Sequence, residues 1–119
     1  MDTTLLILFL LFTKHFVIDF PLQKPYQWMN KGTYGHPGGL LHSGLHGLGT
    51  WLSLVWFTPY AIALALFDFV VHYHVDWAKM NLNAKMGWGA NTHEEFWWLL
   101  GLDQYIHSLT YIAIVAFIV

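Results

Sequence analysis

Cysteine and arginine are both missing from this chain of 119 residues. Without cysteine, the protein forms no disulfide, offers no thiolate to a metal and has no cysteine nucleophile. Charge is also scarce, because charged residues make up only 10% of the chain, against about 25% in ordinary soluble domains. Five lysines against seven acidic residues leave no basic patch, so the composition gives nucleic-acid binding no support.

Apolar residues are abundant instead. Hydrophobic residues make up 56% of the chain, and Phe, Trp and Tyr together make up 18%. A soluble fold of this size could not bury so much apolar surface. The sequence therefore predicts an all-α integral membrane protein with one transmembrane domain, residues 1–119.

Four apolar runs approach or reach the roughly 20 residues that a membrane-spanning helix needs. They predict a polytopic bundle of four transmembrane helices at about 3–22, 39–57, 59–78 and 93–118. Asp2 and Thr58 are the expected N-caps of the first and third helices, and Thr92 with Glu95 has the spacing of a capping box for the fourth.

Lysines outside the predicted helices indicate an orientation. Lys24 and Lys31 fall in loop 23–38, and Lys79 and Lys85 fall in loop 79–92. Because cytoplasmic loops of membrane proteins are enriched in lysine, we expect both loops in the cytoplasm and both termini outside.

Each predicted helix carries two potential metal ligands four residues apart. The four pairs are His15 and Asp19, His42 and His46, His72 and Asp76, and Asp103 and His107. Residues at this spacing share one helix face and lie about 6 Å apart along the axis. Facing inward, the pairs would surround a polynuclear metal site, as in the soluble di-metal carboxylate bundles.

The ligand pairs also recur as a repeat. The segment HFVIDF at 15–20 resembles HYHVDW at 72–77, and HSGLHGL at 42–48 resembles DQYIHSL at 103–109. This pattern suggests two helical hairpins related by a pseudo-two-fold axis along the membrane normal. Such symmetry favours an even number of metal ions, and two is the simplest number.

A ligand set of five histidines and three aspartates suits zinc, iron or manganese. We expect two divalent metal ions, with zinc as the first choice. Three carboxylates offset three of the four charges on such a pair, which leaves room for a hydroxide. The alternative is a metal-free network of His–Asp hydrogen bonds, or a proton relay.

Three further residues are candidates for catalysis. Asp68 lies one turn before His72 and is either a ninth ligand or an acceptor that orients a histidine. Gln104 could bond substrate or water, and Lys79 could attract an anionic head group unless it snorkels to the membrane interface. In addition, Gly44, Gly47 and Gly49 predict close packing of the second helix.

The motifs resemble a domain-of-unknown-function family of small four-helix membrane proteins from bacteria and phages. The resemblance spans nearly the whole chain and rests on HFVIDFPLQK at 15–24, His-x-x-x-His at 42–46, His-x-x-x-Asp-x-x-Lys at 72–79 and Asp-Gln-x-x-His at 103–107. It implies a four-helix membrane protein and no established activity. The expected location is a bacterial inner membrane. A looser similarity, in the His-x-x-x-Asp pairs, is to zinc-dependent phospholipase C and inner-membrane metal-dependent hydrolases. This chain is far shorter and lacks their N-terminal Trp ligand.

Together these features favour a membrane-embedded di-metal hydrolase that acts on a lipid or lipid-linked substrate, with a phosphoester as the candidate bond. The alternatives are a di-iron oxidoreductase of acyl chains, a metal or proton carrier, and a metal-stabilised interaction protein. The sequence leaves homo-oligomer formation open.

Overall fold

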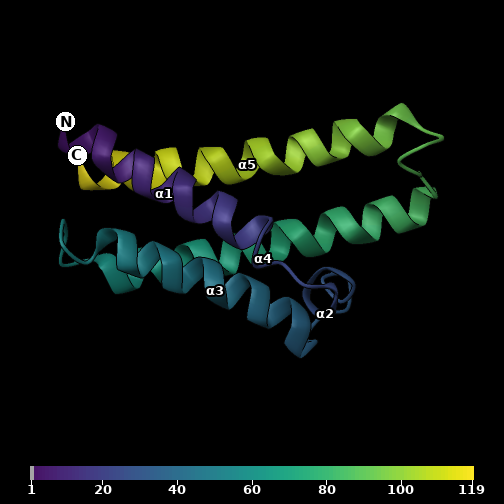
Figure 1. The fold of residues 1–119 in the computed structure, drawn as a ribbon, viewed down its shortest axis with the longest axis horizontal. Helices are drawn as coiled ribbons and strands as arrows, with labels where there is room; N and C mark the ends of the chain where they lie inside the picture. The colour runs from purple at the N-terminus through teal and green to yellow at the C-terminus, as the bar shows by residue number, and fades with distance from the viewer. Residues whose placement is uncertain (1) are drawn as a thin grey trace.

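A computed structural model describes residues 2–119, and these residues form helices but no strand. Four long helices alternate in direction, and a short one lies between the first two of them. The helices are α1 (Thr3–Asp19), α2 (Pro25–Trp28), α3 (Pro37–Leu54), α4 (Ala61–Met86) and α5 (Glu94–Ile118). Figure 1 shows both chain ends at one end of the bundle, and α2 and the α4–α5 connection toward the other end. The all-helical prediction is therefore confirmed.

Two of the helix starts follow from local capping. Asp2 accepts a hydrogen bond from the backbone N–H of Thr4 at 2.7 Å, as predicted for the first helix. The helix α3 begins at Pro37 rather than at 39, because proline tolerates the first helical position and the ring of His36 accepts the N–H of Gly38 at 2.9 Å.

The other two long helices correct the predicted boundaries. The helix α4 begins at Ala61 and continues to Met86, so Lys79 and Lys85 lie on a helix and not in a loop as predicted. It stops at Gly87, whose φ of 69° suits glycine and ends the helix in the left-handed region. The predicted capping box of the fourth helix is wrong, since α5 begins after His93 without a side-chain cap.

Among residues 2–119, α4 and α5 are long and apolar enough to cross a membrane, by length and composition alone. The helices α1 and α3 have 17 and 18 residues, fewer than the roughly 20 that span a bilayer. The structure thus supports two candidate spans, and the prediction of four spans is not confirmed.

Apolar and polar residues occupy different layers of the interior. At the end that holds the chain termini, α1, α3, α4 and α5 contribute a cluster of buried apolar side chains. Its members are Ile7, Leu11, Leu54, Ala61, Leu64, Tyr111, Ile114 and Val115. The next layer, toward α2, holds buried histidines, aspartates and lysines.

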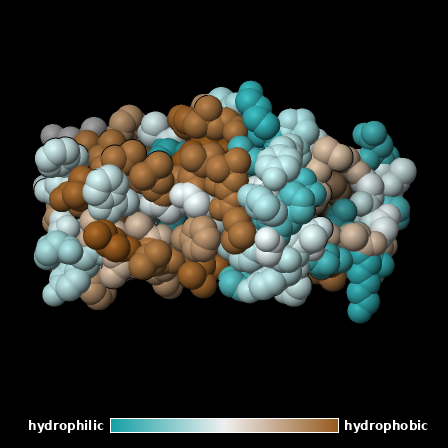
Figure 2. Space-filling model, turned by 90° about the horizontal axis from the view of Figure 1, so that it is seen from below, coloured by the Kyte–Doolittle hydropathy of each residue, from teal (hydrophilic) through white to brown (hydrophobic). Residues whose placement is uncertain are grey.

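Large apolar side chains also cover the outside of the long helices. Examples are Phe9 and Phe16 at 58% exposure and Ile62 at 65%. Figure 2 shows hydrophobic residues concentrated in the left and central part of the face it presents, while hydrophilic residues gather at the right-hand end.

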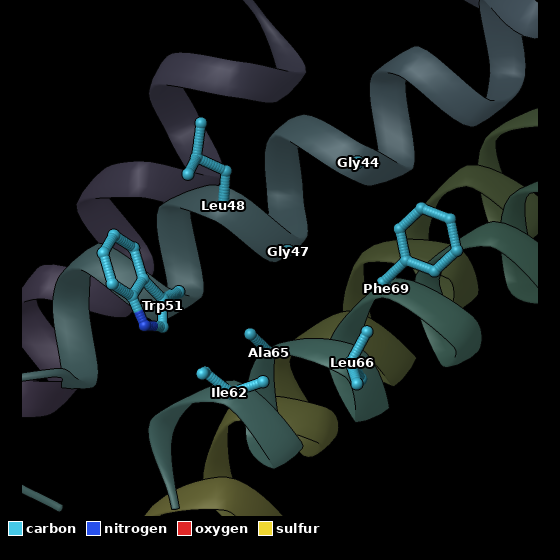
Figure 3. A pocket seen from close by; sticks show the side chains of 8 residues that line it. All are labelled: Gly44, Gly47, Leu48, Trp51, Ile62, Ala65, Leu66 and Phe69. Carbon is cyan, nitrogen blue, oxygen red and sulfur yellow. The ribbon is translucent and has the colours of Figure 1, made fainter. Parts of the chain in front are cut away.

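Glycine allows α3 to lie close to its neighbours. A Cβ atom at Gly47 would lie 3.3 Å from the carbonyl oxygen of Ala65 and from the Cβ of Phe69, both on α4. A Cβ atom at Gly49 would lie 3.0 Å from Ile18 on α1. The predicted close packing at Gly47 and Gly49 is confirmed. Figure 3 shows Gly47 facing Ala65 across a shallow apolar groove between α3 and α4.

Candidate metal centre

All eight predicted ligands are buried in the polar layer of the bundle. They come from the four long helices, two from each, and none exposes more than 9% of its surface. The structure brings six of them into two groups whose ligand atoms lie within 4.8 Å of one another. The four-residue spacing therefore did predict which faces of the helices meet.

The first group contains Asp19, His42, His46 and His72. Oδ1 of Asp19 lies 2.7 Å from Nε2 of His46 and 3.1 Å from Nε2 of His42. Nε2 of His72 is 3.8 Å from the same oxygen. Three helices, α1, α3 and α4, thus direct one carboxylate and three imidazoles toward one point.

The second group contains His72, Asp76 and His107. Oδ2 of Asp76 lies 3.2 Å from Nε2 of His72, and Oδ1 lies 3.2 Å from Nε2 of His107. His72 belongs to both groups, and its ring lies between those of His46 and His107, at centroid distances of 3.7 and 3.8 Å. The two groups therefore form one continuous centre.

The geometry of the centre fits a divalent cation. Nε2 of His42, Nε2 of His72 and Oδ2 of Asp76 are buried and make no hydrogen bond of good geometry within residues 2–119, although Oδ2 of Asp76 forms an ion pair with Lys31 at 3.3 Å. Yet Nε2 of His42 and Oδ2 of Asp76 lie only 3.5 Å apart. Tetrahedral ligands about 2.0–2.1 Å from zinc are roughly 3.3 Å from each other, so these separations match a shared ion. The convergence of buried imidazole and carboxylate atoms at these separations is the observation that favours a metal.

One ligand is oriented as metal-bound histidines usually are. Nδ1 of His42 lies 3.2 Å from Oε1 of Gln27, in α2. When Nδ1–H donates to this amide oxygen, Nε2 has a free lone pair directed at the centre. The sequence analysis did not identify Gln27, because only the fold brings α2 beside α3.

The other two predicted ligands lie at the edges of the centre. Nδ1 of His15 is 2.6 Å from the hydroxyl of Tyr111, and its Nε2 is 2.8 Å from Oε1 of Gln104. Oδ1 of Asp103 is 3.2 Å from Nε2 of His107, and its Oδ2 is 3.3 Å from Nζ of Lys79. Both residues contact the metal groups but lie outside them.

The three predicted catalytic residues lie in different places around the centre. Gln104 donates to Oδ2 of Asp19 at 3.2 Å and to Oδ2 of Asp103 at 3.1 Å, so it links two carboxylates. Lys79 pairs with Asp103. Asp68 lies behind the centre, where it accepts hydrogen bonds from Thr50 and Lys14 and contacts neither metal group.

Two buried lysines were not predicted as part of the site. Nζ of Lys14 is 2.9 Å from Oδ2 of Asp68 and 3.0 Å from Nδ1 of His46. Nζ of Lys31 is 3.3 Å from Oδ2 of Asp76. Lys14 could have been suspected from its place inside an apolar run, whereas Lys31 lies in a connection whose path only the structure shows.

The charges nearly balance in the described side chains. Four carboxylates, those of Asp19, Asp68, Asp76 and Asp103, are buried together. With the histidines neutral, the ammonium groups of Lys14, Lys31 and Lys79 leave one negative charge uncompensated. A bound cation, or one protonated histidine, would balance that charge.

The two halves of the predicted repeat occupy comparable places. The repeat pairs Asp19 with Asp76 and His46 with His107. In the structure, His46 contacts Asp19 and His107 contacts Asp76, each through Nε2 and Oδ1. The correspondence is incomplete, because His42 joins its metal group whereas its counterpart Asp103 pairs with a lysine.

Comparison with known families assigns residues 7–119 to the protein of unknown function family DUF3307. The chain belongs to this family. No curated protein and no solved structure matches it. Membership in DUF3307 therefore agrees with the resemblance to a family of unknown function and adds no activity. The looser similarity to zinc-dependent phospholipases and hydrolases has no support from these comparisons.

Proposed function

We propose that this DUF3307 protein is a membrane-embedded, metal-dependent hydrolase of a lipid or lipid-linked phosphoester. The observation that carries the proposal is the convergence of buried ligand atoms, since Nε2 of His42 and Nε2 of His72 lie 3.5 and 3.2 Å from Oδ2 of Asp76. The centre would hold two divalent ions, most simply zinc, with the six grouped residues as ligands and His15 and Asp103 at its edges.

The outer surface supports a place in the bilayer. Monomeric soluble proteins seldom expose large continuous apolar patches, yet all four long helices expose large apolar side chains while the centre buries charge. The proposed location is a bacterial inner membrane, with α1 and α3 completing the four-helix bundle around α4 and α5. Lys24, Lys79 and Lys85 lie at or toward the end away from the termini, which favours that end as the cytoplasmic one.

Electrostatics favours a reaction at an anionic group. Two divalent ions would reverse the single negative charge of the buried cluster to three positive charges. A hydroxide offsets one of these, a phosphomonoester would offset the other two, and a phosphodiester would offset one of them. A neutral substrate would leave positive charge buried in a medium of low dielectric constant, which is costly.

Each part of the centre has a role in such a hydrolysis. Divalent metals would lower the pKa of a bound water and polarise the phosphoryl group. Gln104 links the carboxylates of Asp19 and Asp103 and so keeps both in place. Lys79, beside Asp103, would stabilise negative charge that develops on the phosphate oxygens. Asp68 fixes Lys14 and so acts on the position of His46.

The structure favours an enzyme over a metal or proton carrier. A carrier must reach both sides of the membrane in turn. Here the polar layer ends at Asp68, Thr50 and Lys14, and the apolar cluster around Leu11 and Leu54 fills the bundle beyond them. The centre is therefore closed toward the chain termini.

Metal-dependent turnover tests the proposal. Purified protein in detergent is incubated with phosphomonoester and phosphodiester lipids, and the products are detected by mass spectrometry. Asp76→Asn should lower turnover at least about a hundredfold, because it removes the charge of a carboxylate that would bind the metal and so weakens metal binding. His74→Gln is the matched control, since His74 lies on the same helix but bonds Tyr34 at the surface. Turnover that survives both a chelator and Asp76→Asn contradicts the proposal, as does an absence of turnover across the lipid panel.

A further inference from the structure

A cavity of about 370 Å³ lies beside the metal centre, on the side of α2 and the second half of α4. It is bounded by residues of the α1–α2 connection, α2, the α2–α3 connection, α4 and α5. Its lining residues are Gln23, Trp28, Lys31, Lys79, Met80, Asn83, Phe96, Leu99 and Leu100. None of these is in either metal group, so the cavity is a separate feature next to the centre.

Two lysines connect the cavity to the centre. Lys31 and Lys79 both line it, and their ammonium groups lie 3.3 Å from the carboxylates of Asp76 and Asp103. Their side chains are only 7% and 16% exposed. A cation bound at Asp76 would weaken the attraction between this carboxylate and the ammonium group of Lys31. An anionic group in the cavity would then pair with the two ammonium groups.

The cavity also contains polar atoms without partners. Oε1 of Gln23 and Oδ1 of Asn83 are buried and have no hydrogen-bond partner within residues 2–119. Buried carbonyl oxygens are normally hydrogen-bonded, so each can accept a hydrogen bond from water or from a ligand in the cavity. Lysines together with amides suit a polar, anionic head group.

The rest of the lining is apolar and leads out between the two candidate membrane helices. Trp28, Phe96 and Leu100 form apolar walls of the cavity. A second groove, of about 210 Å³, shares Lys79 and Leu99 with it. The other residues of this groove are Val75, Ala78, Leu82, Leu102, Asp103 and Ile106 of α4 and α5.

We propose that the cavity binds an anionic amphiphile, with its phosphate between Lys31 and Lys79 and its apolar chain in the groove between α4 and α5. This rests on the proposed function for its place in catalysis, but binding itself does not require turnover. Two ammonium groups select a phosphate over a neutral head group. The apolar groove beside them selects a lipid over free phosphate.

Binding to a non-hydrolysable ligand tests the inference. The probe is the phosphonate analogue of dihexanoyl phosphatidate, titrated calorimetrically into zinc-loaded protein in detergent. Lys31→Gln and Lys79→Gln should each weaken binding by at least about tenfold, because each removes a charge-assisted hydrogen bond. Lys85→Gln is the matched control, since Lys85 is an exposed lysine of the same helix outside the cavity and should leave affinity unchanged.

A second variant distinguishes loss of the cavity from loss of the lysine–carboxylate ion pairs. Leu100→Trp fills the cavity from its apolar wall and leaves both lysine–carboxylate pairs intact. It should weaken binding while the metal content stays unchanged. The affinity for the phosphonate is compared with the affinities for inorganic phosphate and for dihexanoyl phosphatidylcholine.

The outcomes are distinct. Weak binding of free phosphate and of the zwitterionic lipid, with lysine-dependent binding of the phosphonate, supports the inference. Equal affinity for all three ligands, or no effect of Lys31→Gln, Lys79→Gln and Leu100→Trp, overturns it. Lysine-dependent binding without turnover of any lipid contradicts only the proposed hydrolase. Turnover with an unchanged KM in both lysine variants contradicts only the cavity assignment.

Discussion

The ammonium group of Lys14 lies 3.0 Å from Nδ1 of His46, the ring nitrogen on the opposite side from the candidate metal centre. The same group lies 2.9 Å from Oδ2 of Asp68, which also accepts a hydrogen bond from Thr50. A buried ammonium group is costly unless its charge is paired. The residues Lys14, Asp68 and Thr50 therefore form a buried hydrogen-bonded network that fixes the position of His46.

Removing one charge of the Lys14–Asp68 pair should destabilise the protein strongly. Lys14→Met leaves the carboxylate of Asp68 buried and unpaired, so we expect a loss of about 3–5 kcal/mol in the free energy of unfolding. The double variant Lys14→Met, Asp68→Leu removes both charges and should recover much of that loss. Thermal unfolding in detergent is measured for these two variants and for Asp68→Leu alone. If the stability lost in the double variant equals the sum of the losses in the two single variants, the result argues against pairing.

The acceptor behind His42 should control metal affinity. Gln27→Leu removes the oxygen that accepts Nδ1–H, so we expect metal binding to weaken about 10- to 100-fold. Gln27→Glu retains an acceptor and should bind metal at least as well as Gln27→Leu does. Competition with a chelating dye gives the affinities. Equal affinity in the wild type and Gln27→Leu would mean that His42 is not a ligand.

Substituting His72 and substituting His15 should have different effects on the metal content. His72 is shared by both groups, so His72→Ala should remove at least one metal ion per chain. His15 lies outside both groups and already bonds Tyr111 and Gln104, so His15→Ala should retain the metal. Metal content measured on both variants decides between the two-group arrangement and the eight-ligand set expected from the sequence.

Close packing of α3 against α4 should make Gly47 intolerant of substitution. Gly47→Ala places a Cβ 3.3 Å from backbone and side-chain atoms of α4, and we expect a cost of about 1–3 kcal/mol. Gly101→Ala is the control, because a Cβ there meets nothing within 4 Å. It should stabilise α5 by up to about 1 kcal/mol, as alanine favours a helix interior. Thermal unfolding in which both variants behave alike would contradict this packing.

The sequence predicted the parts of the site that depend on helical periodicity. Ligands four residues apart must share a helix face, and Asp19 and His46 meet for that reason. It did not predict the end of α4, because hydropathy falls after 78 while the helix continues until Gly87 allows a left-handed residue. Lys31 lies in the connection between α2 and α3, and Asp76 lies on α4. No local sequence pattern predicts that these two residues are in contact.

Elemental analysis of protein purified in detergent without chelator tests the central claim most directly. It is made beside the double variant His46→Ala, Asp76→Ala and the surface variant His74→Ala, with circular dichroism to establish that each remains helical. The metal centre predicts close to two zinc ions per chain in the wild type and in His74→Ala, and their loss from the folded double variant. Wild-type protein without metal, or a double variant with the same metal content, would contradict the metal centre and leave a buried network of ion pairs in its place.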